Sequence, residues 1–420
     1  MDLFPLFSAV LATAALFSWL NHRFIKLPTT IGVMLIALVM SLGLIALNLV
    51  GVEVREPAVE LLEQLRFREA LLDCMLAFLL FAGALHIDLN LLLGQKRVIG
   101  VLATVGVVVT TFLVALMTWA VTAMVGLEVS FLHCLLFGAL ISPTDPIAVL
   151  GILKQAKAPK SLATKIAGES LFNDGIGVVV FLVMMQLAGG GGHGGDGGGM
   201  TVGDIGVLFS REVFGGVVVG LGTGWLAYLL IRSVDHYQVE VLITLALAMG
   251  GYTLAMSMHA SGPLSVVVSG LLMGNTGRAI GMSAVTRERL DTFWELIDEI
   301  LNVVLFVLIG LEVLVLDFSG PVLLVAVLAI PITLFARFLS VGSTVTALRR
   351  VRDFTPHAVK IMTWGGLRGG ISVALALSIS PDVPARDLIL TVTYVVVCFS
   401  ILVQGLTVKR LVGWIPRDAV

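Results

Sequence analysis

The stretch GALISPTDPIAVLGILK, residues 138–154, is apolar enough to lie in a membrane and yet cannot form one continuous helix. Pro143 and Pro146 lack a backbone N–H donor and break or kink a helix, and the ionisable Asp145 lies between them. Backbone groups freed at mid-membrane are tolerated where they line a cavity, and there they can serve a cation or a carboxylate. The stretch therefore predicts an interrupted membrane helix, with Thr144 and Asp145 at the interruption.

The composition of the whole chain is that of a polytopic membrane protein. The 420 residues are 58% hydrophobic and 13% charged, whereas soluble domains carry about 25% charged residues. A bilayer core needs about 20 apolar residues per helix, and such stretches follow one another through nearly the whole chain. The net charge of -2 gives no indication of a nucleic-acid partner, and no phosphate-binding loop suggests an ATP-driven pump.

Hydropathy, divided at charges and at Gly and Pro clusters, predicts thirteen membrane-spanning helices. They fall at residues 3–21, 28–50, 68–90, 98–125, 130–153, 162–187, 206–231, 238–258, 261–276, 290–316, 321–348, 357–379 and 387–408. Together they predict an all-α polytopic membrane protein with a single transmembrane domain over residues 1–420. The segment 53–69 is predicted to be an interfacial helix, and the Gly-rich segment 188–203 a flexible loop outside the cytoplasm.

The Lys and Arg residues test this layout, because cytoplasmic loops of membrane proteins accumulate basic residues. When alternate loops from Arg23 and Lys26 onward are placed inside, these loops and the C-terminal tail contain nineteen basic residues, and the opposite side contains five. The asymmetry favours thirteen spans, with the N-terminus outside and the C-terminus in the cytoplasm.

Ionisable side chains are costly within the predicted spans, and five of them qualify most clearly as candidates for an ion pathway. They are Asp145, Glu169, Asp174, Arg337 and Arg368. In the stretch GESLFNDG, Asp174 follows Ser170 by four residues, so the two share a helix face, and Glu169 with Asn173 forms an adjacent stripe. One face can offer a carboxylate and a hydroxyl to a hard cation such as sodium, by extension of the oxygen preference of calcium and magnesium.

The twelfth predicted span contains MTWGGLRGGISVALAL, in which four glycines around Arg368 weaken the helix. The guanidinium needs a buried anion, and Glu169 is its predicted partner. Two other interpretations stay open: Asp145 and Asp174 as helix caps near a membrane edge, and Glu169 with Arg368 as a purely structural ion pair. Arg337 lies a few residues from a basic loop, where it can snorkel, and is assigned no role.

Four motifs resemble those of the sodium/proton antiporters of the NhaP type, the bacterial and archaeal relatives of animal sodium/proton exchangers. They are SPTDP at 142–146, GESLFNDG at 168–175, SGPLSVVVSGLLMGN at 261–275 and WGGLRGGISVALAL at 364–377. Their order is that of the family, and the resemblance covers essentially the whole chain.

The resemblance implies an NhaA-like fold, in which two inverted repeats of six helices follow an additional first helix. The first helix would be residues 1–22, and the repeats would be 28–232 and 238–412, with unwound fifth and twelfth helices that cross near the ion site. The resemblance also implies a homodimer in the inner membrane of a prokaryote, in contact with membrane lipid.

The resemblance also assigns roles to individual residues. The expected ion shell consists of Asp174, Asp145, Ser170 and Thr144, the last through its backbone carbonyl. Asn173 would accompany Asp174, and Glu169 with Arg368 would hold the sixth and twelfth helices together. Related exchangers often carry a glutamate in a stretch like LFEGAL, where this chain has LFAGAL with Ala82 in that place, so a third carboxylate near the site is missing.

These residues predict a secondary transporter that exchanges sodium or lithium for protons without a cofactor. Burial disfavours a charged carboxylate, so a proton and a cation would compete for Asp174, and alternating access would couple the two fluxes. The Asn173–Asp174 pair is that of the electroneutral branch of the resembled superfamily, which implies one cation for one proton. A potassium/proton antiporter and, more distantly, a cation channel are the alternatives. An enzyme is not expected, because the spans show neither zinc-ligand spacing nor a Ser/His pairing.

Overall fold

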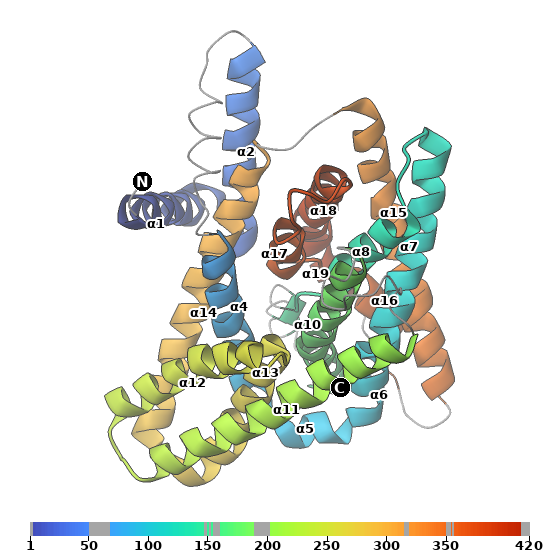
Figure 1. Ribbon diagram of the computed structural model, residues 1–420. Helices are drawn as coiled ribbons and strands as arrows, with labels where there is room; N and C mark the ends of the chain where they lie inside the picture. Colours follow the sequence, from blue (N-terminus) through green and yellow to red (C-terminus); the bar gives the residue numbers. More distant parts are fainter. Residues whose placement is uncertain are drawn as a thin grey trace.

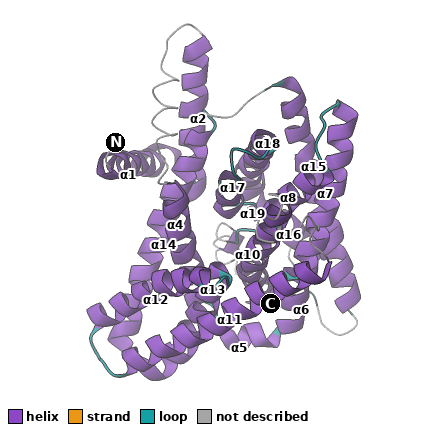
Figure 2. Cartoon of the chain, viewed as in Figure 1, coloured by secondary structure: helices purple, strands orange, loops and turns teal. Residues whose placement is uncertain are grey.

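The computed structural model describes most of the chain, and its regular secondary structure is helical (Figure 2). The described residues are 3–49, 68–146, 149–150, 153, 160–188, 202–314, 319–349, 354 and 357–412. The predicted all-α class is confirmed for these ranges. The predicted interfacial segment 53–69 and the Gly-rich loop 188–203 lie largely outside them.

The helices pack in two groups, each named here after a central member (Figure 1). The α14 group comprises α1 (Leu3–Leu20) with its π-helical extension η1 (Asn21–Ile25), α2 (Thr29–Leu49), α4 (Arg68–Leu85), α11 (Val202–Arg232), α12 (Tyr237–Ser257), α13 (Gly262–Leu272) with its extension η2 (Met273–Gly281), and α14 (Ala284–Glu312). Within it, α14 packs against α2 and α4, and α13 packs against α4, α11 and α12.

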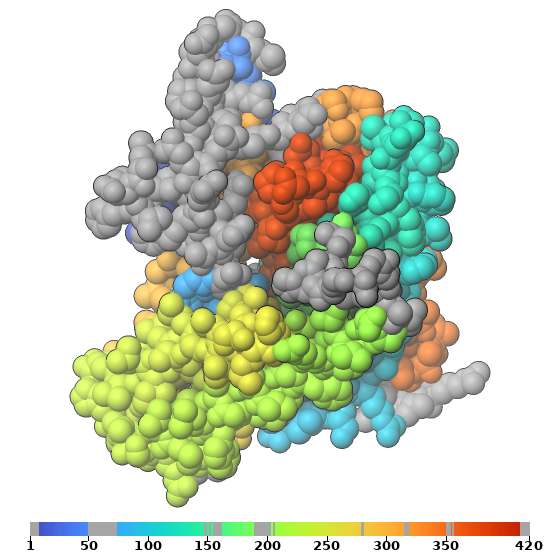
Figure 3. All heavy atoms as spheres, viewed as in Figure 1, coloured from blue at the N-terminus to red at the C-terminus, as the bar shows by residue number. Residues whose placement is uncertain are grey.

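The α10 group contains the remaining helices of the described residues. It comprises α5 (Leu89–Gly94), α6 (Lys96–Ala103), α7 (Val105–Val125), α8 (Phe131–Ile141), α10 (Lys160–Ala188), α15 (Gly320–Leu348), α16 (Ala358–Trp364), α17 (Gly370–Leu377), α18 (Arg386–Phe399), η3 (Ser400–Gln404) and α19 (Gly405–Val412). Helix α10 packs against α6 and α8, and α15 packs against α7 and α18. In the space-filling view the red C-terminal helices lie beside the teal segment of α7 and α8 (Figure 3), in keeping with the contact between α18 and α8.

Seven helices among the described residues are long and apolar enough to cross a membrane, judged by length and composition. They begin at Thr29, Lys96, Leu162, Gly206, Tyr237, Gly320 and Arg386. Each coincides with a predicted span to within a few residues. The chain is therefore a multi-pass membrane protein.

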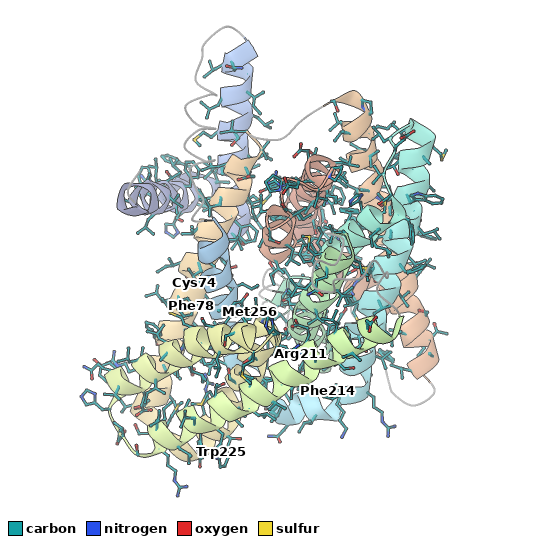
Figure 4. All side chains as sticks on the ribbon, in the orientation of Figure 1. Cys74, Phe78, Arg211, Phe214, Trp225 and Met256 are labelled. Carbon is teal, nitrogen blue, oxygen red and sulfur yellow. The ribbon has the colours of Figure 1, made fainter. Side chains whose placement is uncertain are left out.

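Large apolar side chains project outward from α11. Phe214 is 70% exposed and Trp225 is 53% exposed, and Figure 4 labels both along this helix. Contiguous apolar exposure of this kind is rare on soluble monomers and marks a surface that contacts lipid or another protein. On a multi-pass membrane protein, such a surface is suited to lipid.

Two helices are interrupted where the sequence predicts it. Helix α8 ends at Ile141, and residues 142–146, here called the first interruption, are not helical. Pro143 and Pro146 account for this, because neither can donate the backbone hydrogen bond that a helix requires. Residues 365–369, here called the second interruption, separate α16 from α17.

The two interruptions lie against each other. The N–H of Asp145 donates to the carbonyl of Leu367 at 2.8 Å, which forms an isolated antiparallel bridge. Gly369 permits this approach, since a Cβ at that position would lie 2.6 Å from Oδ2 of Asp145. The contact brings residues more than 200 positions apart together in the α10 group.

Candidate ion-binding site

A cavity of about 600 Å³ lies between the two helix groups. Helices α4 and α14 line one side, and α10, the first interruption and the start of α17 line the other. Its acidic residues are Asp145, Asp174, Glu295 and Asp298, and its other polar residues include His86, Thr144, Asn302 and Ser372. Carboxylate, amide and hydroxyl oxygens are the ligands that hard cations prefer.

Side chains of α10 hold the first interruption in place. The N–H of Thr144 donates to Asn173 Oδ1 at 3.2 Å, and Asn173 Nδ2 donates back to Thr144 Oγ1 at 2.8 Å. Ser170 Oγ lies 3.1 Å from the same Thr144 hydroxyl. All three residues are buried. The backbone N–H of Thr144, which the break in the helix frees, is thus satisfied by Asn173 of α10, the residue before the candidate carboxylate.

Asp174 lies one residue beyond this anchor and lines the cavity at only 5% exposure. Asp145, half-buried, lines the same cavity from the first interruption. The two carboxylates are near enough to interact electrostatically, and Glu169 also contributes to the field at Asp174. The structure therefore brings the predicted residues together: Asp145, Asp174 and Thr144 reach the cavity, and Ser170 and Asn173 bind Thr144.

The ion pair that the structure shows for Glu169 is not the predicted one with Arg368, although the charge of Glu169 also acts on Arg368. Glu169 instead forms an ion pair with Arg337 of α15, whose Nη1 lies 2.5 Å from Glu169 Oε1, and both side chains are at most 5% exposed. Arg337, for which the sequence predicts only snorkelling, lies eleven residues before the end of α15. At 1.5 Å per residue it is about 16 Å from that helix end, too far for the guanidinium to snorkel to the basic loop.

Arg368 serves the first interruption rather than α10. Its Nη1 donates to the carbonyls of Ser142 and Pro143, the latter at 2.9 Å. Its own backbone N–H donates to Ser400 Oγ at 2.8 Å. The last carbonyls of a helix lack intrahelical partners and carry a partial negative charge, so Arg368 caps the C-terminal end of α8.

Sequence reasoning missed the contribution of α14 to the cavity. Glu295, Asp298 and Asn302 are spaced three and four residues apart, which places them on one helix face. That spacing is visible in the sequence of the predicted span 290–316. The sequence does not show that these three side chains face Asp145 and Asp174 across a shared cavity.

The chain is similar throughout its length to known ion exchangers. The family model described as "Sodium/hydrogen exchanger, transmembrane" matches residues 11–414. The chain belongs to the sodium/hydrogen exchanger family. The Na(+)/H(+) antiporter NhaP of Pseudomonas aeruginosa is 48% identical over 412 residues, which cover 97% of this exchanger and 96% of that protein. The Na(+)/H(+) antiporter NhaH of Halobacillus dabanensis is 35% identical over 392 residues, covering 93% and 92%.

The fold of this exchanger is also similar to a solved structure. The sodium proton antiporter MjNhaP1 from Methanocaldococcus jannaschii matches with a TM-score of 0.76 over 99% of both chains, at 20% sequence identity. At this identity the likeness concerns the fold alone. The resemblance of the four sequence motifs is confirmed at the level of the family.

Proposed function

We propose that this exchanger is a secondary active transporter that moves sodium, or lithium, against protons at Asp174. The observation that carries the proposal is the joint placement of Asp145 and Asp174 on one cavity, which Thr144, bonded to Asn173, also lines. The relatives that match nearly the whole chain are named as Na(+)/H(+) antiporters. Asp174, Asp145, Ser170 and the Thr144 carbonyl are the proposed ion ligands.

Competition for one carboxylate couples the two fluxes. An ionised Asp174 at 5% exposure is unfavourable in a low-dielectric site unless a cation compensates it or a proton neutralises it. The site is therefore stable when loaded with either ion, and the empty charged site does not cross. Because a sodium ion replaces a proton on the same carboxylate, the loaded site carries the same charge in both directions, and we propose one-for-one, electroneutral exchange.

Alternating access requires the cavity to close on one side of the membrane and open on the other. The position of the cavity between the α14 and α10 groups supports a relative movement of these groups. We propose thirteen crossings, a first helix over residues 1–22 and inverted repeats over 28–232 and 238–412, with the two interruptions in corresponding helices. A cysteine-accessibility map of the loops tests this layout, and a cytoplasmic N-terminus would contradict it.

The exchange is tested with purified protein in proteoliposomes that contain a pH-sensitive dye. The Asp174→Asn variant should show no sodium-driven proton movement above empty liposomes. Glu128→Gln, which removes a carboxylate from an exposed loop, should keep the full rate. Undiminished exchange by the Asp174→Asn variant would contradict the proposal. The same assay with sodium, lithium and potassium measures which of these ions is preferred.

Stoichiometry and assembly are tested separately. A potassium diffusion potential imposed with valinomycin should leave the exchange rate unchanged, and acceleration by the potential would rule out one-for-one exchange. We also propose a homodimer in the bacterial inner membrane with a cytoplasmic C-terminus. Light scattering of the protein in detergent should give twice the mass of the chain, and a monomeric mass would contradict the dimer.

A further inference from the structure

A stripe of three polar residues on α14 lines the cavity, and its side chains become more buried from one end to the other. Glu295 is exposed, Asp298 is half-buried and Asn302 is 3% exposed, and all three line the cavity. Further along α14, the apolar Leu305 also lines the cavity and packs closely against Gly370 at the start of α17, where a Cβ would clash with the Leu305 side chain. Exposure thus decreases from the outer end of the stripe towards α17.

The inner part of the stripe, Asp298 and Asn302, presents oxygen atoms to the cavity. Asp298 is near enough to Asp145 for the two carboxylates to interact. Asn302 Nδ2 donates to the backbone carbonyl of Asp298 at 2.9 Å, which leaves Oδ1 as the acceptor of this amide. Of the described residues that line the cavity, none is Lys or Arg. Arg278 interacts with Glu295 at the outer end of the stripe, so a mobile cation is the natural partner of Asp298 further in.

The hydroxyl of Ser372, on the opposite wall of the cavity, independently indicates a ligand near the α14 stripe. Ser372 of α17 lines the same cavity and is 1% exposed. Its Oγ has no hydrogen-bond partner among the described residues. Buried hydroxyls without a partner are uncommon in proteins, so this atom indicates a ligand from outside the chain. It lies two residues after Gly370, where α17 meets the inner end of the α14 stripe.

We propose that Asp298, Asn302 and Ser372 form a second binding site for an alkali-metal cation, distinct from the ion shell around Asp174. A carboxylate, an amide oxygen and a hydroxyl make an oxygen-only ligand set, and partial exposure lets the ion keep part of its water shell. A cation that stops here is drawn from bulk water by the Asp298 charge and is then passed to Asp174. This inference rests on the proposed exchange at Asp174.

The site is tested by sodium titration of exchange in proteoliposomes. For Asp298→Asn, the half-saturating sodium concentration should rise about tenfold, the loss expected for one charged ligand, with the maximal rate nearly unchanged. Asp298→Glu should restore most of the affinity. The matched control is Glu299→Gln, which removes a carboxylate one residue further along α14, on the side that faces a groove against α1. Equal effects of Asp298→Asn and Glu299→Gln would overturn the site, as would an unchanged half-saturating concentration.

A second measurement separates this site from Asp174. Sodium should raise the melting temperature of the Asp174→Asn protein in detergent, since the second site is intact, and adding Asp298→Asn or Ser372→Ala should reduce that rise. If the double variants respond to sodium as Asp174→Asn does, the second site is wrong while exchange at Asp174 stands. If Asp174→Asn exchanges normally, the proposed function fails, and the sodium response of Asp298→Asn still decides the second site.

Discussion

The two interrupted helices contribute different things to the site. The first interruption presents side chains: Asp145 lines the cavity, and Thr144 is fastened to Asn173. The second interruption presents backbone towards the cavity at Gly369, next to Gly370 at the start of α17. Its one charged side chain, from Arg368, turns to the carbonyls at the end of α8.

This difference shows how crossed half-helices can hold opposite charges at one place. The C-terminal end of α8 is the negative end of its dipole, and it receives the guanidinium of Arg368. The start of α17 is the positive end of its dipole, and Gly369 beside it contacts the carboxylate of Asp145. Each interruption therefore compensates the charge that the other presents.

The largest expected effect is a loss of stability when the ion pair of Glu169 is broken. It tests whether Arg337 or Arg368 is the partner of Glu169. Glu169→Gln leaves Arg337 buried without its counter-ion, and breaking a buried ion pair costs about 3–5 kcal/mol. We expect a large loss of melting temperature in detergent. In a double-mutant cycle, Glu169→Gln should couple strongly to Arg337→Gln and weakly to Arg368→Gln.

The same double-mutant cycle also tests the assignment of Arg368 to the first interruption. If Glu169→Gln couples more strongly to Arg368→Gln than to Arg337→Gln, Arg368 serves α10 and not the first interruption. A charge exchange of Glu169 with Arg337 should recover part of the stability that either single reversal loses. An exchange of Glu169 with Arg368 should recover none.

A smaller loss of stability is expected when Arg368, which links the second interruption to the first, is replaced. Arg368→Gln removes the charged donor from the carbonyls of Ser142 and Pro143, and hydrogen bonds to charged groups contribute about 1.5–3 kcal/mol each. The variant should lose about 3 kcal/mol of unfolding free energy, together with most of the exchange rate. Arg368→Lys should keep the charge and lose less, because an ammonium can still donate to one carbonyl. Equal losses in both variants would show that the charge at the end of α8 is unimportant.

Much of this arrangement was predictable because it depends on local chemistry. Two prolines interrupt a helix wherever they occur, so the first interruption followed from residues 142–146 alone. The i to i+4 spacing of Ser170 and Asp174 set their common face in the same way. These features need no knowledge of neighbouring helices, and the structure retains them.

Partner choice was not predictable, because it depends on how distant helices pack. Arg337 and Arg368 are both basic residues in apolar spans, and nothing in either stretch says which one reaches Glu169. The packing of α15 against α6 and α7 decides it. The α14 stripe was missed for the same reason, since the partners of Asp298 across the cavity come from other parts of the chain.

The smallest effect concerns the anchor of the first interruption. Asn173→Ala removes the acceptor of the Thr144 N–H and the donor to its hydroxyl, and one buried unsatisfied group costs about 1–3 kcal/mol. We expect a loss of about 1.5 kcal/mol in unfolding free energy and weaker sodium binding in the titration. The matched control is Thr110→Ala, in a buried residue whose hydroxyl bonds within α7, to the carbonyl of Gly106. Because that bond does not touch either interruption, Thr110→Ala should leave the half-saturating sodium concentration unchanged. A rise of similar size in both variants would mean that sodium affinity follows general stability, and the distinct role of the first interruption would then be lost.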